Sequence, residues 1–132
     1  QKVAEMIVSW GLTPLGFIFA FMAALLVLGM LVDGVAMVLL TVPVVFPVAM
    51  ALKIDPVHLA IIITLNVEMG VVTPPVGLNL FAVSGTSNIS LPQVLKGTIP
   101  FFLGDLTVLL LVIFFPALAT WLPAQLVTPV FQ

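Results

Sequence analysis

The chain has 132 residues, of which 63% are hydrophobic and only 6% are charged, and its formal net charge at pH 7 is −2. Soluble domains contain about 25% charged residues, so this composition excludes an ordinary soluble domain and predicts a membrane protein with lipid as its main solvent. Three lysines and no arginine argue against a nucleic-acid partner, and the absence of cysteine excludes disulfides and thiolate metal sites.

Residues 1–14 are predicted to be a connecting segment and not a secretory signal. Lys2 and Glu5 lie close together, and a Thr-Pro break precedes the first long apolar run. Because the sequence starts with Gln1, we expect the chain to be a piece of a longer protein.

The range 15–52 is predicted to be a helical hairpin of two apolar arms, 15–32 and 35–52, joined only by an Asp-Gly pair. Thr13 before a proline predicts the start of the first helix, because its hydroxyl can cap the helix and proline lacks only an unused donor. The arms are either two full membrane spans with a turn at the membrane surface, or a re-entrant hairpin whose tip lies inside protein at membrane depth. Composition leaves both alternatives open.

A polar loop at 53–56 precedes a predicted discontinuous transmembrane helix at 57–82, broken at 70–75. Asp55 before a proline predicts the cap of this helix. The Pro-Pro pair inside the break removes backbone donors and clashes with the preceding turn. In hydrocarbon an unpaired backbone group costs several kcal/mol, so such a break persists only where protein, water or an ion satisfies it.

Polar side chains gather around this break, namely those of Asn66, Glu68, Thr73 and Asn79. An unwound segment between two half-helices offers carbonyl oxygens to Na⁺, and the start of the next half-helix favours an anion through its dipole. The sequence therefore predicts a binding loop. The alternative is a proline kink in an ordinary packed membrane helix.

The rest of the chain is predicted to contain a polar turn and a short helix at 83–99, a last transmembrane helix at 100–123 and a tail at 124–132. Ser90 and Gln93 have the spacing of a capping box that starts the short helix, and a glycine four residues later ends it. A tryptophan near the end of the last helix suits a membrane interface.

Four titratable residues allow more than one interpretation. Glu68 at membrane depth costs about 2.5–3.5 kcal/mol, which favours a functional role, although interfacial placement or pairing with another helix would also explain it. Asp33 is either solvated at a surface turn or faces an ion at a buried tip. Asp105 is expected to be structural near a helix start. His58 is expected to lie at the membrane interface and not to be a ligand.

Five motifs follow one another along the chain: Gly29-Met-Leu-Val-Asp33, Pro43-Val-Val-Phe-Pro47, Lys53-Ile-Asp55, Gly70-Val-Val-Thr73-Pro-Pro-Val-Gly77-Leu-Asn-Leu-Phe81 and Phe114-Phe-Pro-Ala-Leu-Ala-Thr-Trp-Leu-Pro123. In this order they resemble the C-terminal half of the large membrane subunit of tripartite ATP-independent periplasmic (TRAP) transporters, the DctM family. The resemblance covers nearly the whole chain, and the Thr-Pro-Pro-Val-Gly-Leu-Asn block is specific.

The resemblance implies the C-terminal inverted repeat of an elevator-type transporter, an all-α membrane protein with a re-entrant helical hairpin and a proline-broken transmembrane helix. It favours the re-entrant alternative for the hairpin. It also implies that the coupling ion, Na⁺, binds where the hairpin tip meets the helix break. The implied Na⁺ residues are Gly29, Asp33, Gly70, Thr73 and Gly77, and the implied substrate residues are Thr73, Pro74 and Asn79.

The implied function is that of a transport subunit in a Na⁺-coupled secondary transporter of the bacterial inner membrane. It would import an organic acid, such as a C4-dicarboxylate or a sialic acid, delivered by a periplasmic binding protein. The implied partners are the first repeat of the same subunit, a small membrane subunit, the periplasmic substrate-binding protein and the lipid bilayer.

Two other functions stay open on the sequence. One is a related ion-coupled carrier of the dicarboxylate or citrate type, and the other is a structural membrane subunit with a kinked helix and no ion site. The sequence has no Ser/His/Asp set, no paired general acid and base and no metal-spaced histidines, so we expect that it is not an enzyme.

Overall fold

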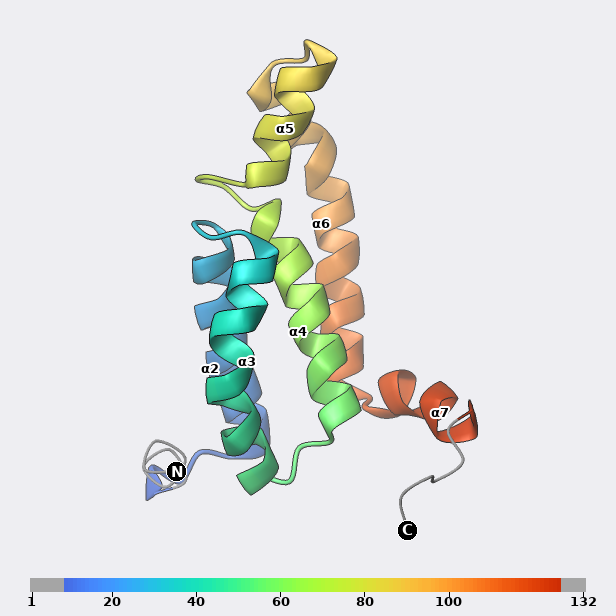
Figure 1. The fold of residues 1–132 in the computed structure, drawn as a ribbon. Helices are drawn as coiled ribbons and strands as arrows, with labels where there is room; N and C mark the ends of the chain where they lie inside the picture. The colour runs from blue at the N-terminus through green and yellow to red at the C-terminus, as the bar shows by residue number, and fades with distance from the viewer. Residues whose placement is uncertain (1–8, 127–132) are drawn as a thin grey trace.

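A computed structural model describes residues 9–126, and every regular element in that range is a helix. α2, α3, α4 and α6 run side by side, α5 continues upward from α4, and α7 runs crosswise at the lower end of α6 (Figure 1). The prediction of an all-α protein is confirmed for the described residues. The helices are α2 (Pro14–Gly29), α3 (Gly34–Ala51), α4 (Pro56–Val71), α5 (Leu78–Ser87), α6 (Leu91–Phe114) and α7 (Ala117–Leu126).

α2 and α3 form an antiparallel hairpin whose outer ends lie at the lower end of the bundle (Figure 1). Thr13 caps α2 as predicted, because the Gly16 N–H donates to its Oγ1 at 3.1 Å. Asp33 caps α3, since its Oδ1 accepts from the N–H groups of Val35 and Ala36 at 3.0 and 3.1 Å. These two caps fix where the hairpin starts and where its second arm leaves the tip.

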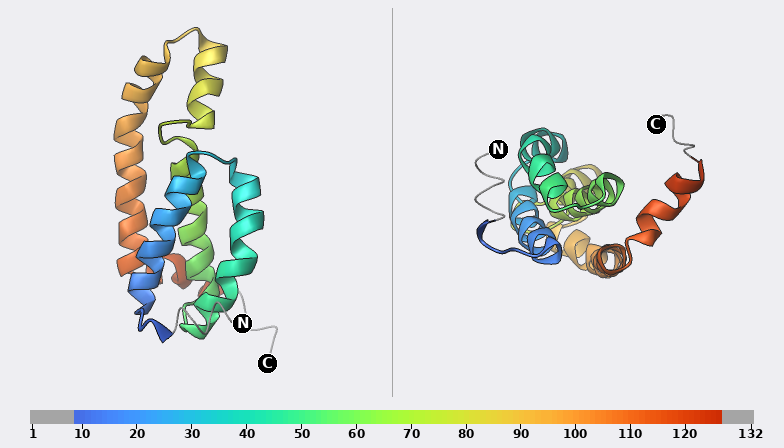
Figure 2. Two further views of the ribbon diagram at one scale, coloured as in Figure 1. Left: turned by 90° about the vertical axis from the view of Figure 1, so that its left-hand side faces the viewer. Right: turned by 90° about the horizontal axis from the view of Figure 1, so that it is seen from below.

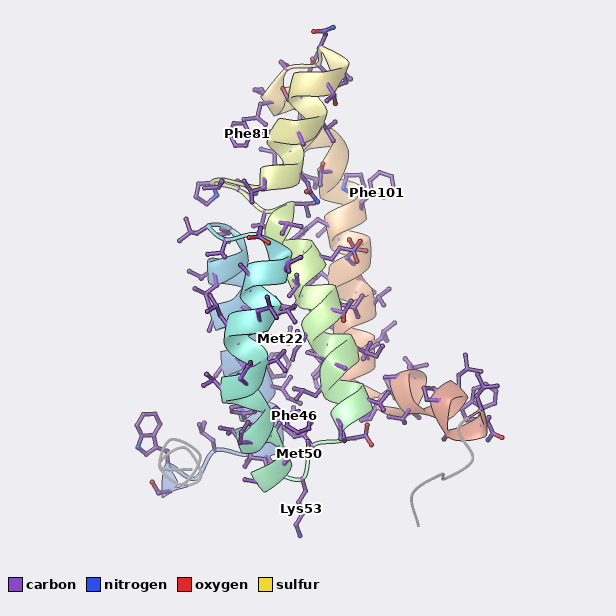
Figure 3. All side chains as sticks on the ribbon, in the orientation of Figure 1. Met22, Phe46, Met50, Lys53, Phe81 and Phe101 are labelled. Atoms are coloured by element: carbon purple, nitrogen blue, oxygen red, sulfur yellow. The ribbon has the colours of Figure 1, made fainter. Side chains whose placement is uncertain are left out.

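α4 lies at the centre of the bundle and packs against α2, α3 and α6. Asp55 caps it as predicted, with Oδ1 accepting from the N–H groups of Val57 and His58 at 2.8 and 3.0 Å. Met22 of α2 belongs to the apolar core between the hairpin and α4 (Figure 3). The largest fully buried apolar side chains of this core are Leu25, Met37, Ile62, Leu109 and Ile113.

Much of the outer surface is apolar. α3 and α6 are long and apolar enough to cross a membrane, and only 22% and 17% of these segments are buried. Phe81 on α5 and Phe101 on α6 are exposed and project from the upper part of the bundle (Figure 3). A surface of this kind needs lipid or further protein to cover it.

The hairpin tip meets the upper end of α4 through a contact between two glycines. A Cβ atom on Gly29 would lie 2.8 Å from the Gly70 Cα, and a Cβ atom on Gly70 would lie equally close to the Gly29 Cα. On the other side of the tip, a Cβ atom on Gly34 would lie 2.9 Å from Cγ1 of Val67. The absence of a side chain at Gly29 and Gly70 therefore lets the two backbones touch.

α5 is longer than the sequence predicts. The broken helix is expected to end near residue 82 with a polar turn after it, whereas α5 continues to Ser87. The hydroxyls of Thr86 and Ser87 donate to backbone carbonyls four residues earlier, so these side chains stay within the helix. Asn88 ends α5 in the left-handed conformation, at φ +55°, which asparagine tolerates better than most residues.

α6 is one continuous helix, whereas the sequence predicts a short helix within 83–99 and a separate helix at 100–123. Pro100 lies inside α6 and removes one backbone donor, and the turns on either side continue. The predicted capping box is wrong, because the Ser90 hydroxyl donates to Oε1 of Gln93 at 2.9 Å and caps no backbone group.

The chain leaves the helical conformation at Phe115, which has φ −121° and ψ 78°. Pro116 follows it, and proline disfavours a helical residue directly before it. α7 then runs crosswise, so 100–123 does not form a single span (Figure 1). Of the predicted tail at 124–132, the first three residues belong to α7, and 127–132 lie outside the described residues, as do 1–8 of the predicted N-terminal segment.

A buried hydrogen bond joins the lower ends of α4 and α6. His58 is only 5% exposed, and its Nε2 lies 2.7 Å from the carbonyl oxygen of Val112. Because residue 116 is a proline, Val112 lacks the N–H partner that a helix supplies four residues later. His58 provides the missing donor, so its Nε2 carries a proton. The sequence predicted a position at the membrane interface for His58 but not that its side chain is buried between two helices.

We predict that His58→Leu destabilises the full-length protein by about 1–3 kcal/mol, because it leaves the Val112 carbonyl unpaired in an apolar interior. The measurement is the free energy of unfolding in detergent micelles titrated with SDS. In a Pro116→Ala background residue 116 regains an N–H, and His58→Leu should then cost less. An equal cost in both backgrounds would contradict this role of His58.

We predict that Gly29→Ala destabilises the full-length protein by about 1–3 kcal/mol, because the added methyl group forces two backbones apart. The matched control is Gly104→Ala on α6, where an added Cβ atom meets nothing within 4 Å. Alanine should stabilise that helix by about 0.5–1 kcal/mol. Unfolding in SDS measures both, and similar values for the two variants would refute the glycine contact.

Candidate functional site

The backbone leaves the helical conformation between α4 and α5, at 72–77, two residues later than the predicted break at 70–75. The Pro74–Pro75 peptide bond is cis. Gly77 adopts a left-handed conformation with φ +51°, and a Cβ atom there would lie 2.8 Å from Cδ1 of Leu80. The positive φ angle and the lack of room for a Cβ atom both favour glycine at this position, where α5 begins.

The break leaves backbone carbonyls without partners. Within residues 9–126, the carbonyls of Val72, Pro74 and Pro75 accept no hydrogen bond. The last turn of α4 is better satisfied, since the Thr73 N–H donates to the Gly70 carbonyl at 3.1 Å and the Thr73 hydroxyl donates to the Met69 carbonyl. The irregular segment therefore concentrates unpaired acceptors just beyond a paired helix end.

The hairpin tip carries a second set of unpaired carbonyls. Those of 29–32 accept no hydrogen bond from any described residue, because the N–H groups at the tip turn back to Leu26 and Leu28. The glycine contact holds this tip against α4, and in two views the loop between α4 and α5 passes close to the tip (Figures 1 and 2). Two carbonyl-rich segments thus lie next to each other.

The structure brings some of the predicted Na⁺ residues together. Gly29 and Gly70 touch, Thr73 follows one turn after Gly70, and Gly77 is buried at the end of the same loop. Asp33 is exposed at the tip, and one of its carboxylate oxygens is occupied by capping α3. No group of three or more His, Cys, Asp or Glu side chains that could hold a metal occurs between residues 9 and 126. A cation here would therefore depend on carbonyl and hydroxyl oxygens.

The predicted substrate residues are less closely grouped. Pro74 and Asn79 are exposed, and Thr73 is half-buried. Thr73 and Pro74 line a cavity of about 220 Å³ against α6, whose wall is almost entirely apolar. That side of the break offers no polar group suited to a carboxylate, so a substrate acid would have to approach from another side. The α6 residues in the cavity wall are Leu95, Thr98, Ile99 and Phe102.

Asn66 has a role that the sequence did not predict. It is 2% exposed, and its Nδ2 donates to the Met22 carbonyl of α2 at 3.2 Å, which ties the hairpin to α4 below the tip. Its Oδ1 is buried without a partner among the described residues. The spacing of Ile62, Asn66 and Gly70 by four residues places them on one helix face, and that periodicity could have located it. Glu68, by contrast, is exposed on α4.

Comparison with known proteins adds independent information. The sequence model of the family described as "Tripartite ATP-independent periplasmic transporter, DctM component" matches residues 1–118. The chain is 40% identical over 129 residues to the C4-dicarboxylate TRAP transporter large permease protein DctM of Vibrio cholerae, covering 98% of this chain and 28% of that protein. It therefore spans less than a third of the length of this relative.

Two further relatives carry other names. The sialic acid TRAP transporter permease protein SiaT of Haemophilus influenzae is 36% identical over 127 residues, which is 96% of this chain and 21% of that protein. The isethionate TRAP transporter permease protein DctMQ of Oleidesulfovibrio alaskensis is 34% identical over 94 residues, which is 71% of this chain and 15% of that protein. These matches confirm the resemblance seen in the sequence and the expectation that the chain is not an enzyme. The chain belongs to the DctM family of membrane permease components of TRAP transporters.

Proposed function

We propose that this chain is the C-terminal inverted repeat of an elevator-type permease that imports an organic acid together with Na⁺. The observation that carries the proposal is the contact of the hairpin tip with the last turn of α4, directly before the break, which brings two groups of unpaired carbonyls near each other (Figures 1 and 2). In hydrocarbon such carbonyls need a partner, and a bound cation is one that fits oxygen acceptors.

The level of the hairpin tip relative to α6 supports a re-entrant hairpin, although α3 by itself is long enough to cross a membrane. α6 has 24 residues and is about 36 Å long at about 1.5 Å per residue, enough for a hydrocarbon core of roughly 30 Å. The arms of the hairpin have 16 and 18 residues, or about 24 and 27 Å. In Figure 1 their tip ends beside the break, while α5 and the start of α6 continue beyond it. The tip would then lie at membrane depth.

Na⁺ would bind between the tip and the break. Carbonyl oxygens near Gly29 and Gly70, the Thr73 hydroxyl and the loop up to Gly77 supply neutral ligands, and Asp33 supplies negative charge from the tip. The Thr73 hydroxyl donates its proton to the Met69 carbonyl, which leaves its oxygen lone pairs free for a cation. An ion shared by both segments would hold them together, so ion binding and substrate affinity become linked.

The substrate would be an organic acid anion. Three relatives are named for C4-dicarboxylate, sialic acid and isethionate, which are all acids. The start of α5 favours such a ligand, because Gly77 caps it without any side-chain hydrogen bond and the first N–H groups of the helix remain available. Asn79 lies in this first turn and is exposed. We assign it to substrate binding together with Thr73 and Pro74.

The complete transporter would contain more than this chain. The first repeat of the same permease would supply the other half of the site, because the chain covers 28% of the Vibrio cholerae relative. A small membrane subunit and a periplasmic substrate-binding protein would complete the tripartite assembly that the family description names. The bacterial inner membrane would hold it, with the binding protein delivering the acid.

We predict that Thr73→Ala raises the Na⁺ concentration for half-maximal uptake by about tenfold, equivalent to about 1.4 kcal/mol, because one oxygen ligand is lost. The measurement is substrate uptake into proteoliposomes that contain the complete permease and its partners, over a series of Na⁺ gradients. Thr107→Ala is the matched control, since Thr107 also donates to a carbonyl four residues earlier but is exposed on α6. Unchanged Na⁺ dependence in Thr73→Ala would disprove the hydroxyl ligand, and Na⁺-independent wild-type uptake would disprove the coupling.

We predict that Asp33→Asn leaves the stability of the permease unchanged and weakens its response to Na⁺. Asparagine caps a helix about as well as aspartate, so the hydrogen bonds to Val35 and Ala36 are kept while the charge is removed. Unfolding in SDS and Na⁺-dependent uptake are measured on the same preparation. Unchanged stability together with normal Na⁺ dependence would contradict the prediction and show that Asp33 acts only as a cap.

A further inference from the structure

α7 leaves the bundle in a different direction from every other described helix. The chain turns at Phe115 and Pro116, and α7 then runs crosswise to α6, as both the side view and the view from below show (Figures 1 and 2). A helix crosswise to a membrane-spanning helix lies parallel to the membrane plane. Its depth is then set by the level at which α6 ends.

If α6 crosses the bilayer, that level is the membrane–water boundary. α6 is about 36 Å long and exceeds a hydrocarbon core of roughly 30 Å, so its two ends lie at the two boundaries. Lys53 is exposed in the loop between α3 and α4 and projects downward from the same end as α7 (Figure 3). Asp55 follows it and lines a cavity with Thr120 and Pro123 of α7. Charged side chains therefore mark the end of the bundle where α7 lies.

The two faces of α7 differ. Ala119 is buried, and Thr120 and Pro123 are half-buried on the side that packs on the start of α4. On the other side Leu118, Trp121 and Leu122 are 62%, 64% and 55% exposed, at the spacing of one helix face. α7 carries no charged side chain. An uncharged helix that exposes leucine and tryptophan side chains at this level needs an apolar partner that tolerates an indole N–H.

We propose that α7 is an interfacial helix whose Leu118–Trp121–Leu122 face lies in the boundary between the lipid headgroups and the acyl chains. Three observations select lipid as the partner: the crosswise direction, the charged residues at the same level, and a tryptophan in the exposed face. The contact fixes the depth of the lower end of α6, and through the His58–Val112 bond that of α4. This placement depends on α6 spanning the bilayer and does not depend on Na⁺ coupling.

The test is a depth measurement on the complete permease in phosphatidylcholine vesicles. The sequence has no cysteine, so a nitroxide label can be placed at Leu118→Cys or Leu122→Cys after cysteines elsewhere in the permease are replaced. Collision of the label with oxygen, which concentrates in lipid, and with a water-soluble nickel chelate gives its depth. Lys53→Cys is the reference for water and Leu103→Cys, exposed in the middle of α6, is the reference for deep lipid.

The expected result is that both α7 labels favour oxygen over nickel and lie about 5–10 Å into the boundary region, between the two references. Low collision with both reagents at Leu118 and Leu122 would mean that protein covers α7, and a nickel response like that of Lys53→Cys would mean that α7 lies in water. A depth equal to that of Leu103→Cys would mean that α7 enters the hydrocarbon core. Each of these three results would overturn the proposal. Labelled protein must elute as wild type does on size exclusion, and the two α7 positions check each other.

Discussion

Backbone carbonyls without partners are the constraint on which this fold depends, because lipid offers them no hydrogen-bond donor. Prolines create such carbonyls at more than one place. Near the end of α6, Pro116 takes away the partner of Val112, and His58 from a distant helix replaces it. At the Pro74–Pro75 break the Thr73 N–H donates to the Gly70 carbonyl, but the carbonyls of Val72, Pro74 and Pro75 accept no hydrogen bond from the described residues. Pro116 thus ends α6 without leaving an unpaired carbonyl at Val112. The Pro74–Pro75 pair leaves unpaired carbonyls that a ligand or further protein can contact.

The packing of α2 against α4 determines that the hairpin tip lies beside the upper end of α4. Gly29 and Gly70 let the two backbones touch at the tip, and the bond from Asn66 to the Met22 carbonyl fixes the same helices lower down. The tip cannot separate from the upper end of α4 without losing these contacts. A ligand that binds both the hairpin tip and the loop between α4 and α5 would therefore bind to segments that are already held in place.

Local sequence signals predicted the helix starts well. Thr13 and Asp55 cap their helices as expected, because a cap needs only its own side chain and the next few N–H groups. The continuous α6 was not predicted, since Pro100 and a glycine read as helix ends when only their immediate neighbours are considered. In the structure the turns on either side of Pro100 stay helical. The buried position of His58 was missed for a related reason, because its partner lies 54 residues away.

The sequence by itself determined that this chain is a helical membrane protein, where most helices begin, and that the Pro74–Pro75 pair interrupts one of them. Composition, capping residues and prolines act over a few neighbours, so they can be read without the fold. Only the tertiary structure decided that Gly29 at the hairpin tip touches Gly70 in the last turn of α4, that Asn66 is buried against α2, and that α7 turns across the bundle. Those features depend on contacts between segments far apart in the chain. Gly70 and Asn66 have their roles only because the fold places Gly29 and the Met22 carbonyl next to them.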